Sequence, residues 1–366
     1  AASDVYKRQR VDSVTITFLV IGGFLVLLFM GMPVFGALGA SSVAGILMVQ
    51  GVRGLGAVPG VIYDRLAVFP LVAVPLFILM GEIIFHSGIG SNIFTATNRW
   101  CNKLPGSMGM ASVAACAIFS ALCGVSVAGA ATIGSFAIPE MLRRGYNKSL
   151  ATGCVAASGG LALLIPPSVA LILYGVVGDE SVGKLFIAGI VPGVVLAGLM
   201  MGYIFIIGIF RPDLAPRGDE EVSRRMRYEA LFQIWPAILL IILVLGSIYK
   251  GIATPTEAAA VGCVGALILA YFKKKLNWQI FRSILRSTIS TSTMIMLIFA
   301  SALLFGYVLT RLQVPQELAS YVATLDMPNW VILLCIFALI YIMGMFMDVV
   351  SVILISTPIL LPIVLQ

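Results

Sequence analysis

The apolar stretch 107–142 carries residues whose types could do chemistry. Its middle combines glycines with hydroxyl side chains, and it is interrupted at Cys123-Gly124. The hydroxyl residues that we single out are Ser120, Ser126 and Thr132. Oxygen atoms are the ligands that hard cations prefer in proteins. We therefore interpret this stretch as part of a site for a cation such as Na⁺.

A second apolar stretch, 149–175, contains helix breakers near its centre. These are Gly159-Gly160 and Pro166-Pro167. Pro167 has no backbone N–H, and the residue before a proline avoids the α-helical region, so the helix must break around Ile165-Pro166. A broken helix exposes carbonyl oxygens that suit Na⁺, and the N-terminus of a half-helix suits a carboxylate. The alternative is a simple proline kink.

Acidic residues are rare in the apolar runs. Those in or beside such runs are Glu82, Glu140, Glu257 and Asp348. A carboxylate inside a membrane is costly, which makes it a functional candidate by default. We favour Asp348, because it lies beside Ser351 and near a second expected break at Gly344.

The other three acids have simpler interpretations. Glu140 is expected to pair at the membrane edge with Arg143 or Arg144. Glu82 is interpreted as a scaffold contact. Glu257 follows a proline at the start of a helix, where a negative charge interacts favourably with the helix dipole.

His86 is the only histidine of the chain, and we place it at the rim, at the end of a span. The six cysteines form no CxxC pair and lie mostly in apolar segments. GxSxG, HExxH and Walker A motifs are also absent from the sequence. These absences argue against multi-histidine metal catalysis, ATP-driven work and an intramembrane enzyme. We expect no cofactor and no metal other than Na⁺.

The composition is that of a membrane protein. Hydrophobic residues make up 60% of the 366, charged residues make up 11%, and the mean hydropathy is +1.07. Soluble domains contain about 25% charged residues. The net charge of +7 comes from Lys and Arg between apolar runs, where they set topology, so we expect a lipid bilayer and not nucleic acid as partner. Spanning candidates fall at 14–32, 34–51, 70–86, 107–142, 149–175, 184–210, 232–249, 254–272, 289–310 and 329–366.

Both flanks of 107–142 are basic, with Arg99 and Lys103 before it and three basic residues after it. By the positive-inside rule the segment therefore enters and leaves on the cytoplasmic side. Two short full spans would also satisfy this pattern. We favour a re-entrant helical hairpin, because its polar middle is tolerated at membrane depth only inside protein or beside a water-filled cavity.

Two pairs of segments suggest an internal repeat. Residues 31–48 match 253–270 at an offset of 222, and 125–139 match 350–362, with Ser126 opposite Ser351 and Pro139 opposite Pro362 at offsets of 225 and 223. If the first repeat crosses the membrane an odd number of times, the second repeat has the opposite orientation in the membrane. Inverted repeats with broken helices are typical of secondary transporters.

The predicted organisation has three parts. Residues 1–12 form a polar leader, native or foreign. Residues 13–231 form the first repeat, with scaffold helices, the hairpin 107–142, the broken helix 149–175, a helix at 184–210 and a cytoplasmic loop at 211–231. Residues 232–366 form the second, inverted repeat, which we expect to be truncated before its own broken helix. The fold class is an all-α polytopic membrane protein with re-entrant hairpins and broken helices.

Five motifs together resemble the large membrane subunit of the TRAP transporters, the DctM type, from about residue 14 onward. They are PLFILMGEI (75–83), FSALCGVSVAGAATIGSFAIPEM (119–141), GGLALLIPPSVALILYG (159–175), ATPTEAAAVG (253–262) and MGMFMDVVSVILISTPILLPI (343–363). The resemblance implies a multi-pass protein of the bacterial inner membrane. It also implies an elevator-type mechanism, as in the wider ion-transporter superfamily.

The resemblance further implies Na⁺ symport of an organic acid, such as a C4-dicarboxylate, sialic acid or another sugar acid. The implied partners are a small four-helix subunit of the DctQ type and a periplasmic substrate-binding protein of the DctP type. The alternative is a single-component Na⁺-coupled carboxylate carrier. We assign to the cation site Ser120, Ser126, Gly159, Gly160, Pro166, Asp348 and Ser351. We assign to the substrate site Ser126, Thr132, Pro167 and Ser168.

Overall fold

The structure is a computed structural model that describes residues 2–218, 222–324 and 327–364. All regular elements in these ranges are helices. Six are long and apolar enough to cross a membrane, or seven if α11 (Arg224–Gln233) and α12 (Trp235–Tyr249), bent by 48°, count as one broken span. The prediction of an all-α polytopic membrane protein is confirmed.

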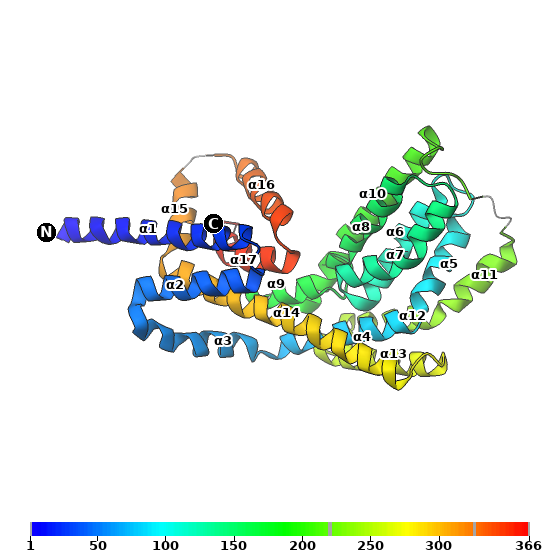
Figure 1. Cartoon of the computed structure of the whole chain (residues 1–366), viewed down its shortest axis with the longest axis horizontal. Coiled ribbons are helices and arrows are strands. Elements are labelled where there is room, and N and C mark those ends of the chain that lie inside the picture. The colour runs from blue at the N-terminus through cyan, green and yellow to red at the C-terminus, as the bar shows by residue number, and fades with distance from the viewer. Residues whose placement is uncertain (1, 219–221, 325–326, 365–366) are drawn as a thin grey trace. The chain divides into compact units, whose positions relative to one another are not determined.

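The chain divides into two compact units, which Figure 1 shows with the helices labelled. The first unit comprises residues 1–68, 173–180 and 292–366, and the second comprises residues 69–172 and 181–291. The long helix α14 (Trp278–Arg311) contributes its first part to the second unit and its remainder to the first. Each unit is described by itself below.

The first unit is built around the close approach of three helices. Its elements are α1 (Ala2–Phe29), α2 (Val34–Gly54), η1 (Leu55–Ala57), α3 (Val58–Leu66), α15 (Val314–Thr324), α16 (Asn329–Phe346) and α17 (Val349–Val364). A Cβ added to Gly45 of α2 would lie 2.8 Å from Val308 of α14 and 2.9 Å from Val20 of α1. The rings of Phe24 and Phe305 pack beside them, with centroids 5.5 Å apart.

The second unit holds the predicted hairpin and the first predicted broken helix. Its elements include η2 (Phe69–Val72), α4 (Ala73–His86), α5 (Ile89–Cys101), α6 (Ser107–Cys123), α7 (Ser126–Arg143), α8 (Lys148–Gly159), η3 (Gly160–Leu163), α10 (Val182–Phe210), α11, α12 and α13 (Pro255–Phe272). The helix α9 (Val169–Val177) begins in this unit and ends in the other. Helices α6, α7, α8 and α10 lie side by side (Figure 1).

Helix α4 packs along α13 in this unit, and small and polar groups hold the two together. The hydroxyl of Thr256 donates to the carbonyl of Phe69 at 3.3 Å. The thiol of Cys263 donates to the carbonyl of Leu76 at 2.9 Å. Gly262 leaves room for the side chain of Met80. The first part of the predicted second repeat therefore packs against α4 of the first.

The helices recur with the spacing that the sequence repeat predicts. α6 begins at Ser107 and α16 at Asn329, 222 residues later, while α7 begins at Ser126 and α17 at Val349, 223 residues later. Pro139 and Pro362 lie inside these last two helices. The helix starts place Ser126 opposite Val349, two residues before its predicted counterpart Ser351. The inverted orientation and the repeat boundaries stay predictions.

Two predicted features differ from the structure. The second break lies at Met347-Asp348 and not at Gly344, which is inside α16. The helix α16 ends where Met347 becomes extended, and Asp348 accepts hydrogen bonds from the N–H groups of Val350 and Ser351 at the start of α17. The predicted loop 211–231 becomes helical at Arg224, where α11 begins.

Besides α11, sequence patterns did not predict three further helices: α3, α5 and α15. Helix α5 is the clearest case, because it buries Ile89, Ile93, Phe94 and Cys101 at helical spacing. It was missed because its thirteen residues are too short and too polar to be a span.

The packing of α4 on the hairpin gives a test of the fold. A Cβ added to Gly81 would lie 2.5 Å from the Cβ and 3.1 Å from the Cα of Cys123. We expect Gly81→Ala to lower the free energy of unfolding by about 1–3 kcal/mol through overpacking. The measurement is the apparent unfolding temperature of the purified protein in detergent.

The matched control is Gly198→Ala on α10, where an added Cβ meets nothing within 4 Å. That change should be neutral or slightly stabilising, because alanine favours the helix over glycine. Equal stability of the two variants would show that α4 does not press on the hairpin turn.

Candidate functional site

The hairpin turns where the sequence predicts its interruption. Helix α6 ends at Cys123, Gly124 adopts a left-handed φ of +65°, and α7 begins at Ser126. The N–H of Gly124 donates to the carbonyl of Ser120 at 3.0 Å and closes the last turn of α6. A Cβ at Gly124 would collide with the carbonyl oxygen of Pro167. Glycine is therefore required here by conformation and by space.

The second interruption is also where the sequence predicts it. Helix α8 ends at Gly159, a 3-10 turn runs to Leu163, and α9 begins only at Val169. The Pro166-Pro167 peptide bond is cis. In the described part of the chain, no backbone N–H donates to the carbonyls of Ile165, Pro166 or Pro167. Three carbonyl oxygens at this break are thus without a backbone partner.

The two interruptions meet inside the second unit. The N–H of Val169 donates to the carbonyl of Gly124 at 3.2 Å, which joins the broken helix to the hairpin turn. A Cβ added to Gly159 would lie 2.7 Å from the Cβ of Ala130 and 3.1 Å from the carbonyl oxygen of Ser126. Glycine at each contact lets the backbones approach closely. Gly160, by contrast, has nothing within 4 Å of an added Cβ.

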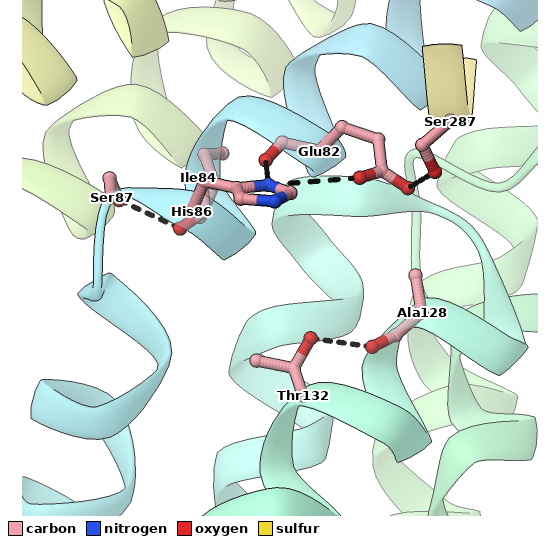
Figure 2. Close-up of polar contacts among 7 residues, drawn as sticks. All are labelled: Glu82, Ile84, His86, Ser87, Ala128, Thr132 and Ser287. Atoms are coloured by element: carbon pink, nitrogen blue, oxygen red, sulfur yellow. Dashed lines mark hydrogen bonds and ion pairs between the residues drawn. The ribbon is translucent and has the colours of Figure 1, made fainter. Parts of the chain in front are cut away.

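The hydroxyls of this region differ in their partners. Thr132 donates to the carbonyl of Ala128 at 2.6 Å, as Figure 2 shows, and Ser168 donates to the carbonyl of Leu163 at 2.8 Å. Ser120 is fully buried, and its hydroxyl has no hydrogen-bond partner in the described residues. A buried unpaired hydroxyl costs about 1–3 kcal/mol, so it needs an explanation. A cation bound between the two breaks would supply one.

The start of α7 is open to an anion. Its N-cap residue is Val125, which is extended and makes no side-chain cap hydrogen bond. The first N–H groups of a helix point outward and carry a partial positive charge. Cation and carboxylate binding in this region stay predictions.

The remaining assigned residues, Asp348 and Ser351, belong to the first unit. The Asp348 carboxylate accepts from the N–H of Val350 at 3.0 Å and from that of Ser351 at 3.3 Å, and it also accepts from the hydroxyl of Ser351. This is the hydrogen-bond pattern of a helix N-cap. Asp348 is exposed and Ser351 is buried. A ligand role for this pair stays a prediction.

Two other acids make the contacts that the sequence predicts. Glu140 lies 3.1 Å from Arg144 and 3.9 Å from Arg143. Glu257 accepts from the N–H of Thr254 at 2.8 Å, and its own N–H donates to the Thr254 hydroxyl at 3.3 Å, which is a capping box.

Glu82 makes a contact that the sequence does not specify. It accepts a hydrogen bond from Ser287 at 2.7 Å, and His86 lies 3.9 Å away at the end of α4 (Figure 2). His86 lies one helical turn from Glu82, whereas Ser287 lies 205 residues away in the sequence. Only its position inside an apolar run could have indicated a special role.

A cavity of about 420 Å³ lies elsewhere in the second unit. Val113 of α6, Gly153 of α8 and Tyr203 of α10 are among its lining residues, and the lining is mostly apolar. It does not include the hairpin turn. Within the described ranges, no three His, Cys, Asp or Glu side chains are grouped to hold a metal ion. The predicted cation site between the two breaks consists of carbonyls and hydroxyls, which are groups of a different kind.

Comparisons with known proteins agree on one family. Residues 21–366 match the family model described as the DctM component of the tripartite ATP-independent periplasmic transporters. The C4-dicarboxylate TRAP transporter large permease protein DctM of Pseudomonas aeruginosa is 36% identical over 299 residues, which cover 81% of this chain and 69% of that protein. The isethionate TRAP transporter permease protein DctMQ of Oleidesulfovibrio alaskensis is 33% identical over the whole chain, which spans 57% of its length. The sialic acid TRAP transporter large permease protein SiaM of Vibrio cholerae is 33% identical over 93% of this chain and 79% of that protein.

Ser120 gives a direct test of the hydroxyl geometry. Because its hydroxyl is buried without a partner, we expect Ser120→Ala to leave stability unchanged or to raise it by about 1 kcal/mol. Ser158→Ala is the matched control, since Ser158 is also fully buried and donates to the carbonyl of Val155 at 3.0 Å. The control should lose about 1 kcal/mol. Unfolding of both variants is measured in Na⁺-free buffer, and an equal loss would show that Ser120 has a partner.

Proposed function

Because the chain belongs to the DctM family of tripartite ATP-independent periplasmic transporters, we propose that it is the large membrane subunit of a Na⁺-coupled importer of organic acids. The family and the six or seven apolar helices make it a multi-pass protein of the bacterial inner membrane. Family members are transporter permeases, so we treat its function as transport and not catalysis.

The meeting of the two helix breaks is the observation that carries the proposal. Carbonyl oxygens without backbone partners at 165–167 and the unpaired hydroxyl of Ser120 belong to segments joined by the Val169–Gly124 hydrogen bond. Irregular backbone at membrane depth persists where it lines a cavity or a binding site. Oxygen ligands of this kind suit Na⁺, and unwound helices hold coupling ions in other secondary transporters.

The substrate class is supported by the relatives and by the start of α7. The names of three relatives specify C4-dicarboxylate, isethionate and sialic acid, which are all organic anions. The uncapped N-terminus of α7, beginning at Ser126, offers N–H groups and a positive dipole end to such an anion. Thr132, Pro167 and Ser168 complete the proposed substrate site.

The proposed coupling between Na⁺ and substrate follows from the closeness of the proposed cation site and the proposed anion site. A cation held by carbonyls of 165–167 and by the hairpin would fix the position of the first turn of α7. Fixing that turn before the anion arrives strengthens anion binding, and by reciprocity the anion strengthens Na⁺ binding. We propose that movement of the loaded site follows an elevator mechanism.

The proposed partners are a small four-helix membrane subunit and a periplasmic substrate-binding protein. The word tripartite in the family description and the fused DctMQ name of one relative support them. The alternative is a single-component carrier, which would take its substrate directly from solution.

The test is uptake of labelled organic acids by the full-length chain reconstituted with its small subunit. The periplasmic binding protein is added or omitted, and Na⁺ is replaced by K⁺. We expect uptake to require both. Uptake without the binding protein would favour the single-component carrier, and uptake that is indifferent to Na⁺ would refute the cation site.

Three substitutions test which residues bind Na⁺. Ser120→Ala and Ser126→Ala are expected to raise the half-saturating Na⁺ concentration roughly fivefold each, the factor for about 1 kcal/mol of lost interaction. Asp348→Asn separates charge from capping, because asparagine caps a helix as well as aspartate does. If the Asp348 charge binds Na⁺, this variant loses coupling while keeping its stability. Unchanged Na⁺ dependence in all three variants would contradict the assignments.

A further inference from the structure

The carboxylate of Glu82 joins helices from the two predicted repeats. Glu82 is on α4, and Ser287, whose hydroxyl donates to Oε1 at 2.7 Å, is on the first part of α14. Both residues belong to the second unit. Only 16% of the Glu82 side chain is exposed. The hydrogen bond is therefore a largely buried cross-link between segments some two hundred residues apart.

The charge of Glu82 is weakly compensated. The Nδ1 atom of His86 lies 3.9 Å from Oε2, but it is 3.0 Å from the backbone carbonyl of Glu82 itself. A carbonyl only accepts, so the ring N–H is directed to the backbone and not to the carboxylate. No lysine or arginine pairs with Glu82 among the described residues. Ser287 is thus the one close donor to this carboxylate in the described ranges.

Gly81, the residue before Glu82, brings the Glu82–Ser287 contact close to the hairpin turn. Gly81 packs directly on Cys123, the last residue of α6 before Gly124. Farther along, Gly90 packs on Thr132 of α7, with an added Cβ only 2.6 Å from its methyl group. Figure 2 shows the Glu82, His86 and Ser287 contacts in one view with Ala128 and Thr132 of α7. The end of α4 and the start of α5 therefore pack against both helices of the hairpin.

We infer that Glu82 is a positioning residue for the hairpin turn, because its hydrogen bond to Ser287 fixes the end of α4 on which Cys123 rests. Glu82 does not touch the proposed ligands. It acts on them through Gly81 and Cys123, and thereby sets where Ser120 and the start of α7 lie relative to the broken helix. Of the two experiments that follow, only the uptake experiment rests on the proposed function.

The first experiment follows hydrogen–deuterium exchange at the backbone amides of 124–129 in the full-length protein. Ser287→Ala removes the donor and leaves α4 intact. We expect exchange at these amides to rise roughly threefold, the factor for an average hydrogen bond between membrane helices. Glu82→Ala should have the same effect. Glu82→Gln should stay close to the wild type, because the amide oxygen still accepts from Ser287.

Ser247→Ala is the matched control. Ser247 is a partly buried serine of the same unit, and its hydroxyl donates to the carbonyl of Val244 within α12 at 2.8 Å. It should leave exchange at 124–129 unchanged. If Ser287→Ala also leaves it unchanged, or if Ser247→Ala raises it equally, the positioning role is refuted.

The second experiment measures the Na⁺ dependence of uptake for the same variants. A positioning role predicts a roughly threefold rise in half-saturating Na⁺ for Ser287→Ala and Glu82→Ala, with rescue in Glu82→Gln. A merely structural role would lower the amount of folded protein without moving the half-saturating concentration, and would overturn the inference. If wild-type uptake does not depend on Na⁺, the proposed function fails, while the exchange experiment still decides the role of Glu82.

Discussion

The need of every backbone N–H and C=O for a partner in lipid is the constraint on which the rest of this structure depends. An uninterrupted helix meets that need by itself, but a broken one does so only where other protein surrounds it. Here one break supplies a partner to the other, since the carbonyl of Gly124 accepts from the N–H of Val169. The two interruptions are therefore in direct contact inside the second unit.

Close approach of the two breaks restricts the residues that fit there. Gly124 lies against the carbonyl of Pro167, and Gly159 lies against Ala130 and the carbonyl of Ser126. Any side chain at these glycines would separate the segments and expose their polar groups. Among the described residues, the hydroxyl of Ser120 has no hydrogen-bond partner and the carbonyls of 165–167 have no backbone partner.

The four acids in or beside the apolar runs lie at helix ends or between helices. Glu257 and Asp348 accept hydrogen bonds from the N–H groups of first turns, where the helix dipole is favourable. Glu140 pairs with arginine at the end of α7. Glu82 differs, because its close donor among the described residues is a hydroxyl from another helix. It is the acid whose placement depends most on tertiary structure.

The sequence by itself determined the helical membrane class and the positions of both breaks in the second unit, because each follows from local chemistry. Apolar length specifies spans, and the left-handed Gly124 and the Pro166-Pro167 pair each favour a local interruption of the helix. It placed the last break at Gly344, because a glycine alone does not show where a helix ends; in the structure the break lies where Met347 is extended and Asp348 caps the start of α17. It also missed α5, whose burial arises from packing on α6. Only the tertiary structure decided that the two breaks touch and that Glu82 meets Ser287, because contacts between distant segments depend on how helices pack and not on the pattern of either segment.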